Sequence, residues 1–251
     1  MVALALGQAL GPFMMGLAAG DARVAPTGRL FLIGFIVALV SFASSFLLRV
    51  APPKPAKTGT APPLRVVEIL KLQGLVWVIF ASVMTVTTLD ILVVYLPLLG
   101  TERHLEASHV GWLLTARALS SMASRLAYVS LFRVFGRVPL TVGTMALSTL
   151  GLFLLALPVP LILMYVAVVA VGYGLGISAT LTLSGIVEIA PVAARATAMS
   201  MRLTGNRIGQ VALPFSASLL AAPTGVPGVL VVTAVAVAVA GFAVQKTYPR
   251  R

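Results

Sequence analysis

The sequence contains no cysteine and few charged residues. Without cysteine, the 251-residue chain can form neither a disulfide nor a thiolate metal site. Charged residues make up only 10% of the chain, whereas soluble domains carry about 25%. Apolar residues make up 59%, and the mean hydropathy is +1.06. A soluble chain this apolar could not cover its own surface, so the composition indicates a membrane protein.

Acidic residues are the scarcest charged type, with 6 Asp and Glu against 18 Lys and Arg and a net charge of +12. Such an excess can indicate a nucleic-acid partner. Here the basic residues fall between apolar runs rather than in one patch, so a membrane location is favoured and no nucleic-acid partner is expected.

Residues suited to catalysis or metal binding are also scarce within the apolar runs. Asp90 is the one acid well inside such a run, and no histidine accompanies it. An intramembrane enzyme would need a polar catalytic pair. His104 and His109 flank a loop, at a spacing poor for metal ligands. We therefore expect no enzyme activity, no metal and no cofactor.

Long apolar runs dominate what is present. A bilayer core about 30 Å thick needs roughly 20 apolar residues of helix. Eight runs approach that length: 2–20, 29–50, 75–99, 110–132, 138–157, 161–187, 197–221 and 226–245. No Lys or Arg precedes the first run and Gly11-Pro12 interrupts it, so a span is favoured there over a signal peptide. The sequence predicts an all-α polytopic membrane protein with about eight transmembrane helices.

The longest connector divides the spans into two and six. Its first half is rich in proline and basic residues, which is typical of an extended linker. From Pro63 onward, apolar and charged residues alternate, which predicts a short amphipathic helix on the inner membrane surface. The expected domains are two helices in 1–50, the cytoplasmic linker in 51–74, six helices in 75–245 and a cytoplasmic tail in 246–251.

The basic residues are divided unevenly between alternate connectors, and cytoplasmic connectors carry the excess. One set of connectors, with the C-terminal tail, holds Arg49, Lys54, Lys57, Arg65, Lys71, Arg125, Arg133, Arg137, Arg195, Lys246, Arg250 and Arg251. The other set holds only Arg23, Arg29 and Arg103. The first set is therefore predicted to be cytoplasmic, with both termini inside, in a plasma membrane of the bacterial inner-membrane type.

A short pattern recurs six spans apart. Residues 7–11 read Gly-Gln-Ala-Leu-Gly, and residues 205–209 read Gly-Asn-Arg-Ile-Gly. A Pro-Phe pair follows each copy, at 12–13 and at 214–215. Parallel repeats of six spans build one known transporter architecture.

With these motifs the chain resembles a major facilitator superfamily transporter that begins at the family's fifth helix. Gly7, Gly11, Pro12 and Gly16 match a fifth-helix motif of its drug-proton antiporters, while Met15 departs from it. The segment from Arg125 to Arg137 resembles a basic cytoplasmic loop motif. There Gly136 and Arg137 match, but Val129 replaces a glycine and Arg133 replaces the acid. The resemblance implies a partial fold: the last two helices of one half and a complete second half.

Glycines four apart predict close helix packing. Gly7 and Gly11, like Gly205 and Gly209, would let helix backbones approach in lipid, and Pro12 would bend its helix. The resemblance adds a second interpretation, a hinge that prevents leakage between the two halves. The run with Gly172, Gly174 and Gly176 lies mid-membrane, so it too is predicted to serve helix packing rather than nucleotide binding.

Charges within spans are the candidates for chemistry, because they are costly there. Asp90 lies about 14 Å and Arg117 about 10 Å from the outer end of their helices at ~1.5 Å per residue. The two spans are antiparallel neighbours, so the side chains could meet. We weigh a static structural pair against proton coupling or cation binding at Asp90, and against a lipid-facing position.

A second polar group lies in the seventh span, where Arg202, Asn206 and Gln210 are four apart and form one stripe. A role facing a substrate or anion competes with a simpler one, in which Arg202 and Arg207 extend to the inner surface. Glu188 and Arg195 are expected to pair at that surface.

Three functions remain open. The first is proton-coupled alternating-access export of a small amphipathic compound, with the substrate, protons and membrane lipids as partners. The second is uptake of an organic anion, because arginines outnumber Asp90 within the spans. The third is a non-transporting fragment that assembles with, or regulates, a full-length relative. A truncated chain would be expected to cover its unpaired helix faces by forming an oligomer.

The topology can be tested by cysteine labelling, since the chain has no native cysteine. We expect Lys57→Cys to be protected from a membrane-impermeant maleimide in intact cells and labelled after permeabilisation. A cysteine at Glu106, in the predicted external loop, should be labelled in both conditions. Labelling of Lys57→Cys in intact cells would contradict the predicted orientation.

Overall fold

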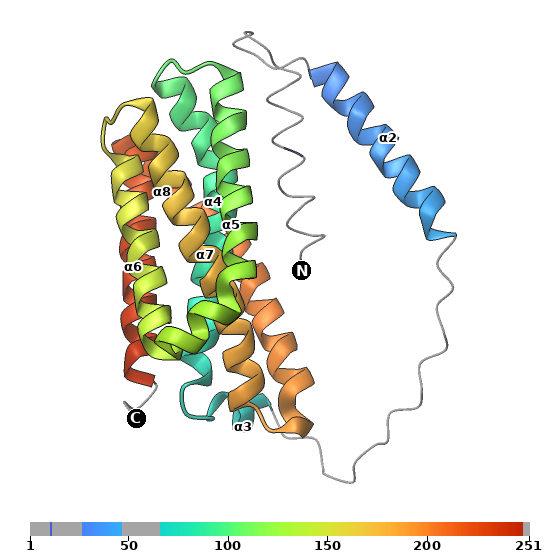
Figure 1. Cartoon of the computed structure of the whole chain (residues 1–251), viewed down its shortest axis with the longest axis vertical. Helices are drawn as coiled ribbons and strands as arrows, with labels where there is room; N and C mark the ends of the chain where they lie inside the picture. The colour runs from blue at the N-terminus through green and yellow to red at the C-terminus, as the bar shows by residue number, and fades with distance from the viewer. Residues whose placement is uncertain (1–10, 12–26, 47–65, 248–251) are drawn as a thin grey trace.

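The computed structural model of the chain describes residues 11, 27–46 and 66–247. Every regular element in this part of the chain is helical, and none of these residues lies in a strand. The elements are α2 (Thr27–Ser45), α3 (Val66–Leu70), α4 (Leu75–Glu102), α5 (Ala107–Phe135), α6 (Arg137–Ala156), α7 (Leu161–Ile189), the short 3-10 helix η1 (Val192–Ala194) and α8 (Arg195–Thr247). Figure 1 shows α4 to α8 gathered in one bundle, with α2 apart from it. The all-α fold is confirmed.

Among the described residues, four helices are long and apolar enough to cross a membrane: α4, α6, α7 and the stretch Thr224–Gln245 of α8. α2 contributes a shorter apolar helix, Phe31–Ser45. The predicted spans 110–132 and 197–221 are also helical, within α5 and α8, but each carries two arginines. The predicted span 2–20 lies outside the described residues except for Gly11.

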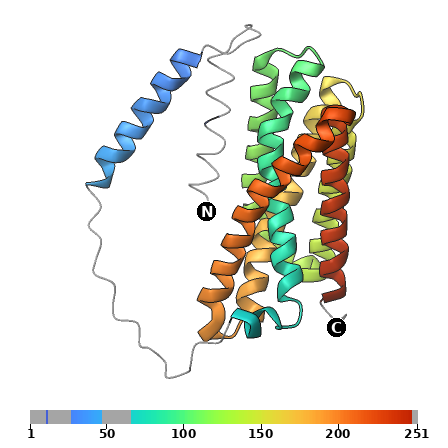
Figure 2. The same cartoon turned by 180° about the vertical axis from the view of Figure 1, so that it is seen from behind.

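α8 consists of two helical arms joined at one residue. Gly225 has φ 66° and ψ −172°, a conformation that is not helical and that favours glycine. The first arm spans 195–224 and the second 226–247. Figure 2 shows the two arms meeting at one end of the bundle and running back in opposite senses. The predicted loop between the seventh and eighth spans is thus a bend at a single glycine.

α7 lies between α5 and α6 and packs closely against both, while α8 packs against α4 and α6. The main core is apolar, and Leu92, Leu113, Leu152 and Val171 are members from four different helices. α2 makes no comparable packing, and its side chains, such as Phe31, are exposed. The six helices from α4 to the second arm of α8 therefore form one packed unit.

Bare glycine backbones allow the approach of α7 to its neighbours. A Cβ atom added to Gly172 would lie 2.3 Å from the carbonyl oxygen of Arg117 on α5, and one on Gly174 would lie 2.4 Å from that of Thr144 on α6. A Cβ atom on Gly176 would again meet α5. The described structure thus uses these glycines in helix packing.

The bundle has two distinct ends. At one end, α3 packs against the start of α4 and the α7–α8 junction, through Ile69, Leu75, Ile186 and Ala194. Ile69 is fully buried while Val67 is exposed, so this short helix presents one face to the bundle. The other end holds the α4–α5 and α6–α7 connections and the bend in α8. The first end is the one predicted to be cytoplasmic.

The α5–α7 contact predicts an unequal response to two glycine substitutions. Gly172→Ala places a methyl group against the Arg117 carbonyl, and overpacking of this kind costs about 1–3 kcal/mol. Gly143→Ala on α6 is the matched control, since its Cβ atom would meet nothing within 4 Å. We expect a lower thermal unfolding midpoint in detergent for the first variant and an equal or higher one for the second. Equal midpoints would contradict the packing role of Gly172.

Candidate functional site

A second close approach brings the first arm of α8 against α4. A Cβ atom on Gly209 would lie 2.5 Å from Val83 Cγ1 and 2.8 Å from Thr87 Oγ1. One on Gly205 would lie 3.2 Å from Val83 Cγ2. These two glycines, four residues apart, leave room for polar side chains of α8 to reach α4.

At the end of this contact nearer α3, Arg202 and Asn206 share one partner on α4. Arg202 Nε donates to Ser82 Oγ at 2.7 Å. Ser82 Oγ in turn donates to Asn206 Oδ1 over a longer 3.5 Å. Ser82 and Asn206 are buried, and Arg202 is partly buried. The guanidinium of Arg202 is therefore engaged within the protein.

Two turns further along α4, Asp90 is held by Gln210. Gln210 Nε2 donates to Asp90 Oδ2 at 2.8 Å. Arg207 Nη1 donates to Gln210 Oε1, also at 2.8 Å. Gln210 thus links exposed Arg207 to the partly buried carboxylate through two hydrogen bonds. The spacing of the α8 stripe placed Gln210 on this face, but the sequence did not identify it as the partner of Asp90.

Arg117 faces this carboxylate from α5. Its side chain is 5% exposed. Within the described part of the chain it makes no hydrogen bond or ion pair, and its Nε is buried without a partner. Asp90 is the charged group that attracts it. Asp90 lies twelve residues before the end of α4 and Arg117 ten residues after the start of α5, so the two lie at similar depths of this antiparallel helix pair. Asp90 nevertheless bonds Gln210 rather than Arg117. We call Asp90, Arg117 and Gln210 the charge site.

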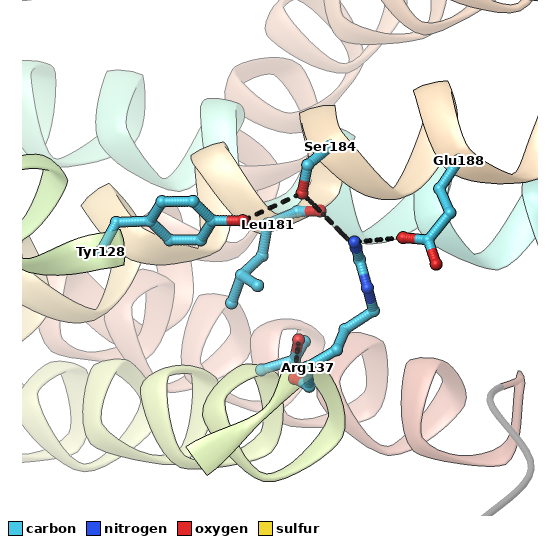
Figure 3. A network of polar contacts seen from close by, with 6 residues as sticks. Tyr128, Arg137, Leu181, Ser184 and Glu188 are labelled. Atoms are coloured by element: carbon cyan, nitrogen blue, oxygen red, sulfur yellow. Dashed lines mark hydrogen bonds and ion pairs between the residues drawn. The ribbon is translucent and has the colours of Figure 1, made fainter. Parts of the chain in front are cut away.

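A separate polar network joins the α5–α6 hairpin to α7, as Figure 3 shows. Arg137 forms an ion pair with Glu188 through Nη2. Its Nη1 donates to the Leu181 carbonyl at 3.2 Å and to Ser184 Oγ at 3.4 Å. The Tyr128 hydroxyl lies 3.3 Å from the same Ser184 oxygen. This one arginine therefore holds the last turns of α7 in place.

The predicted pairing of Glu188 with Arg195 is wrong. In the described residues Glu188 pairs with Arg137, and Arg195 Nε donates to the Ala190 carbonyl at 3.3 Å. The reason is geometric, because Glu188 lies on the last turn of α7 beside the start of α6. The family's loop motif has an acidic residue at the position of Arg133. In this chain Glu188 of α7 is the acid that pairs with the loop, through Arg137.

The remaining loop-motif residues differ in their surroundings. Gly136 has φ 73° and joins α5 to α6 without a longer loop. Arg133 is exposed, whereas Arg125 is partly buried and its Nη1 has no partner among the described residues. Of the fifth-helix motif, Gly7, Pro12 and Gly16 lie outside the described residues, and a Cβ atom on Gly11 would meet nothing within 4 Å.

At the other end of the bundle, where α4 joins α5, two adjacent charged residues contact the ends of other helices. Sequence analysis did not identify them as candidates for such a role. Glu102 Oε1 accepts from the Val226 backbone N–H at 3.4 Å, at the start of the second arm of α8. Arg103 Nη2 donates to the carbonyls of Leu155 and Leu157, at 2.7 and 2.6 Å, where α6 ends. Each charge suits the helix end it contacts. Burial lowers the pKa of the Arg103 guanidinium, and neighbouring Glu102 opposes that shift.

An apolar cavity of about 360 Å³, including its open mouth, lies between α4 and both arms of α8. Its lining includes Met84, Thr88, Ile91, Leu213, Val229 and Thr233. Among the described residues, no group of three or more His, Asp or Glu side chains could hold a metal ion.

A helical bundle with four membrane-length helices among the described residues, and with charged side chains held between helices, defines a polytopic membrane protein. Residues 78–251 match the family model of the Major Facilitator Superfamily, so the chain belongs to this superfamily. Comparison with curated proteins gives no match. The family assigns the chain to the membrane transport of small molecules.

The Arg137 network predicts unequal effects for its two charged members. Arg137→Gln leaves the Leu181 carbonyl and the Ser184 hydroxyl without this donor and should lower the free energy of unfolding by about 1–3 kcal/mol. Glu188→Gln should cost less than about 1 kcal/mol, because the Glu188 side chain is 64% exposed. Denaturant unfolding in detergent measures both, with exposed Arg133→Gln as the control. Equal losses for Arg137→Gln and Glu188→Gln would show that the ion pair alone matters.

Proposed function

We propose that the protein is a proton-coupled transporter that exports a small amphipathic compound in exchange for protons. The observation that supports this most is the charge site. There, a carboxylate inside the bundle is bonded by Gln210 from α8 and attracted by Arg117 from α5. Intramembrane carboxylates commonly mark proton and substrate pathways.

The antiport mechanism follows from competition at Asp90. An ionised Asp90 attracts a cationic group of the substrate, whereas a protonated Asp90 is neutral and holds it weakly. The substrate and the proton therefore alternate at one carboxylate. Gln210 can donate to the ionised acid and accept from the protonated one through its amide oxygen. Rocking of the six-helix unit against a second half would expose the site to each side in turn.

The direction of transport and the location rest on sequence features. The match of Gly7, Gly11, Pro12 and Gly16 to the drug-proton antiporter motif supports export. The excess of Lys and Arg in alternate connectors supports cytoplasmic termini in an inner membrane of the bacterial type.

Uptake of an organic anion is the second candidate, and the buried Arg117 Nε, which has no partner among the described residues, favours it. An anion bound at Arg117 would neutralise the positive charge nearest to Asp90 among the described residues, and a neutral Asp90 would not repel that anion. Protonation of Asp90 and anion binding would then assist each other. Proton release on substrate binding therefore indicates antiport, and proton uptake indicates anion symport.

Asp90→Asn should abolish proton-driven flux in proteoliposomes and leave substrate exchange at equal pH at least partly intact, because the amide cannot ionise. Flux driven by an imposed pH gradient and counterflow without a gradient measure the two activities, with a panel of amphipathic cations, anions and zwitterions. Glu106→Gln, in an exposed connection, is the control. Proton-driven flux in Asp90→Asn equal to that of the unmodified protein would eliminate Asp90 as the coupling residue.

A further inference from the structure

The charge site holds two opposite charges that attract each other without forming an ion pair. Asp90 has one oxygen bonded to Gln210, and no hydrogen bond from the described residues reaches the other. Arg117 makes no side-chain hydrogen bond within the described part of the chain. A negative and a positive group therefore lie at similar depths of two antiparallel helices, each with bonding capacity left among the described residues.

Such an arrangement is costly in a membrane protein. Each charge at the centre of a span costs at least about 2.5–3.5 kcal/mol, and buried donors without acceptors add to this. A direct ion pair would offset part of the cost. Gln210 instead holds the carboxylate toward α8, and the backbone of Arg117 is packed against Gly172 on α7. Each of the two charges is thus positioned by a different helix contact.

The other charged groups near the site are already engaged or lie further away. Arg207 is bonded to the oxygen of Gln210, behind Asp90. Arg202 is bonded to Ser82, eight residues before Asp90 on α4 and so about 12 Å along the helix at ~1.5 Å per residue. Among the described residues, Arg117 is therefore the cation left free to bind a ligand near Asp90.

We infer that the charge site binds an amphipathic zwitterion, with its ammonium group beside Asp90 and its carboxylate beside Arg117. An ammonium donates to a carboxylate through up to three protons, and a guanidinium binds a carboxylate through two parallel N–H bonds. The inference rests on the proposed function, and as in that antiport mechanism, substrate binding releases a proton. On binding, the ammonium group takes the place of the proton on Asp90, and that proton leaves to the solvent.

The test uses three compounds with the same apolar body and the purified full chain in detergent. Phenylalanine carries both charges, phenylalaninamide only the positive one and N-acetylphenylalanine only the negative one. Matching leucine and tryptophan series vary the body. Isothermal titration calorimetry should show that, in at least one series, the zwitterion binds about tenfold or more tightly than either single-charge analogue.

Two variants assign each charge to its residue. Arg117→Gln should remove the preference for the amino acid over its amide, and Asp90→Asn should remove the preference over the N-acetyl form. Arg117→Lys keeps the positive charge and should retain part of the first preference, which separates lost binding from misfolding. Lys71→Gln, at an exposed position, should leave both preferences unchanged.

The outcomes separate this inference from the proposed function. Equal binding of amide and amino acid, unaffected by Arg117→Gln, would overturn the zwitterion while leaving proton-coupled export at Asp90 intact. Binding by no member of the three series would also overturn it. Preserved zwitterion binding without any proton release would support the site and contradict the antiport mechanism.

Discussion

The close approach of α7 to two neighbouring helices is the constraint on which the bundle depends. Gly172 and Gly176 bring its backbone against α5, and Gly174 brings it against α6. In lipid, apolar surface alone gives helices little reason to associate, so tight packing and hydrogen bonds between helices must supply it. The hydroxyls of Thr144 and Ser178, 3.1 Å apart, add one such bond between α6 and α7. α7 thereby joins α5 and α6 into one unit.

The contact between α4 and the first arm of α8 uses the same principle for another purpose. Gly205 and Gly209 again remove Cβ atoms from the closest point. Here the freed space admits polar side chains, since Gln210 follows one of these glycines directly and reaches Asp90. One glycine contact is therefore almost wholly structural, whereas the other places hydrogen-bonding groups inside the membrane-spanning bundle.

Local properties of the sequence were sufficient to predict the helices but not their partners. Hydropathy and run length are local, so the predicted span 161–187 agrees with α7 to within a few residues. The turn residues near Gly225 predicted a loop, yet one positive φ angle reverses the chain there. Pairings depend on how distant helices rotate against each other. Charge and proximity in sequence therefore suggested Arg195 for Glu188, and no local signal linked Gln210 to Asp90, 120 residues away.

The two glycine contacts meet at the charge site. The atom that Gly172 approaches is the carbonyl oxygen of Arg117 itself, so the α5–α7 contact fixes the backbone of the cation. The α4–α8 contact fixes the carboxylate through Gln210. The distance between the charges is therefore set by how the two helix pairs sit against each other. Because their attraction varies inversely with that distance, any sliding of one pair past the other changes how strongly Asp90 and Arg117 attract each other. The two glycine contacts thus determine together how Asp90 and Arg117 are placed in the bundle.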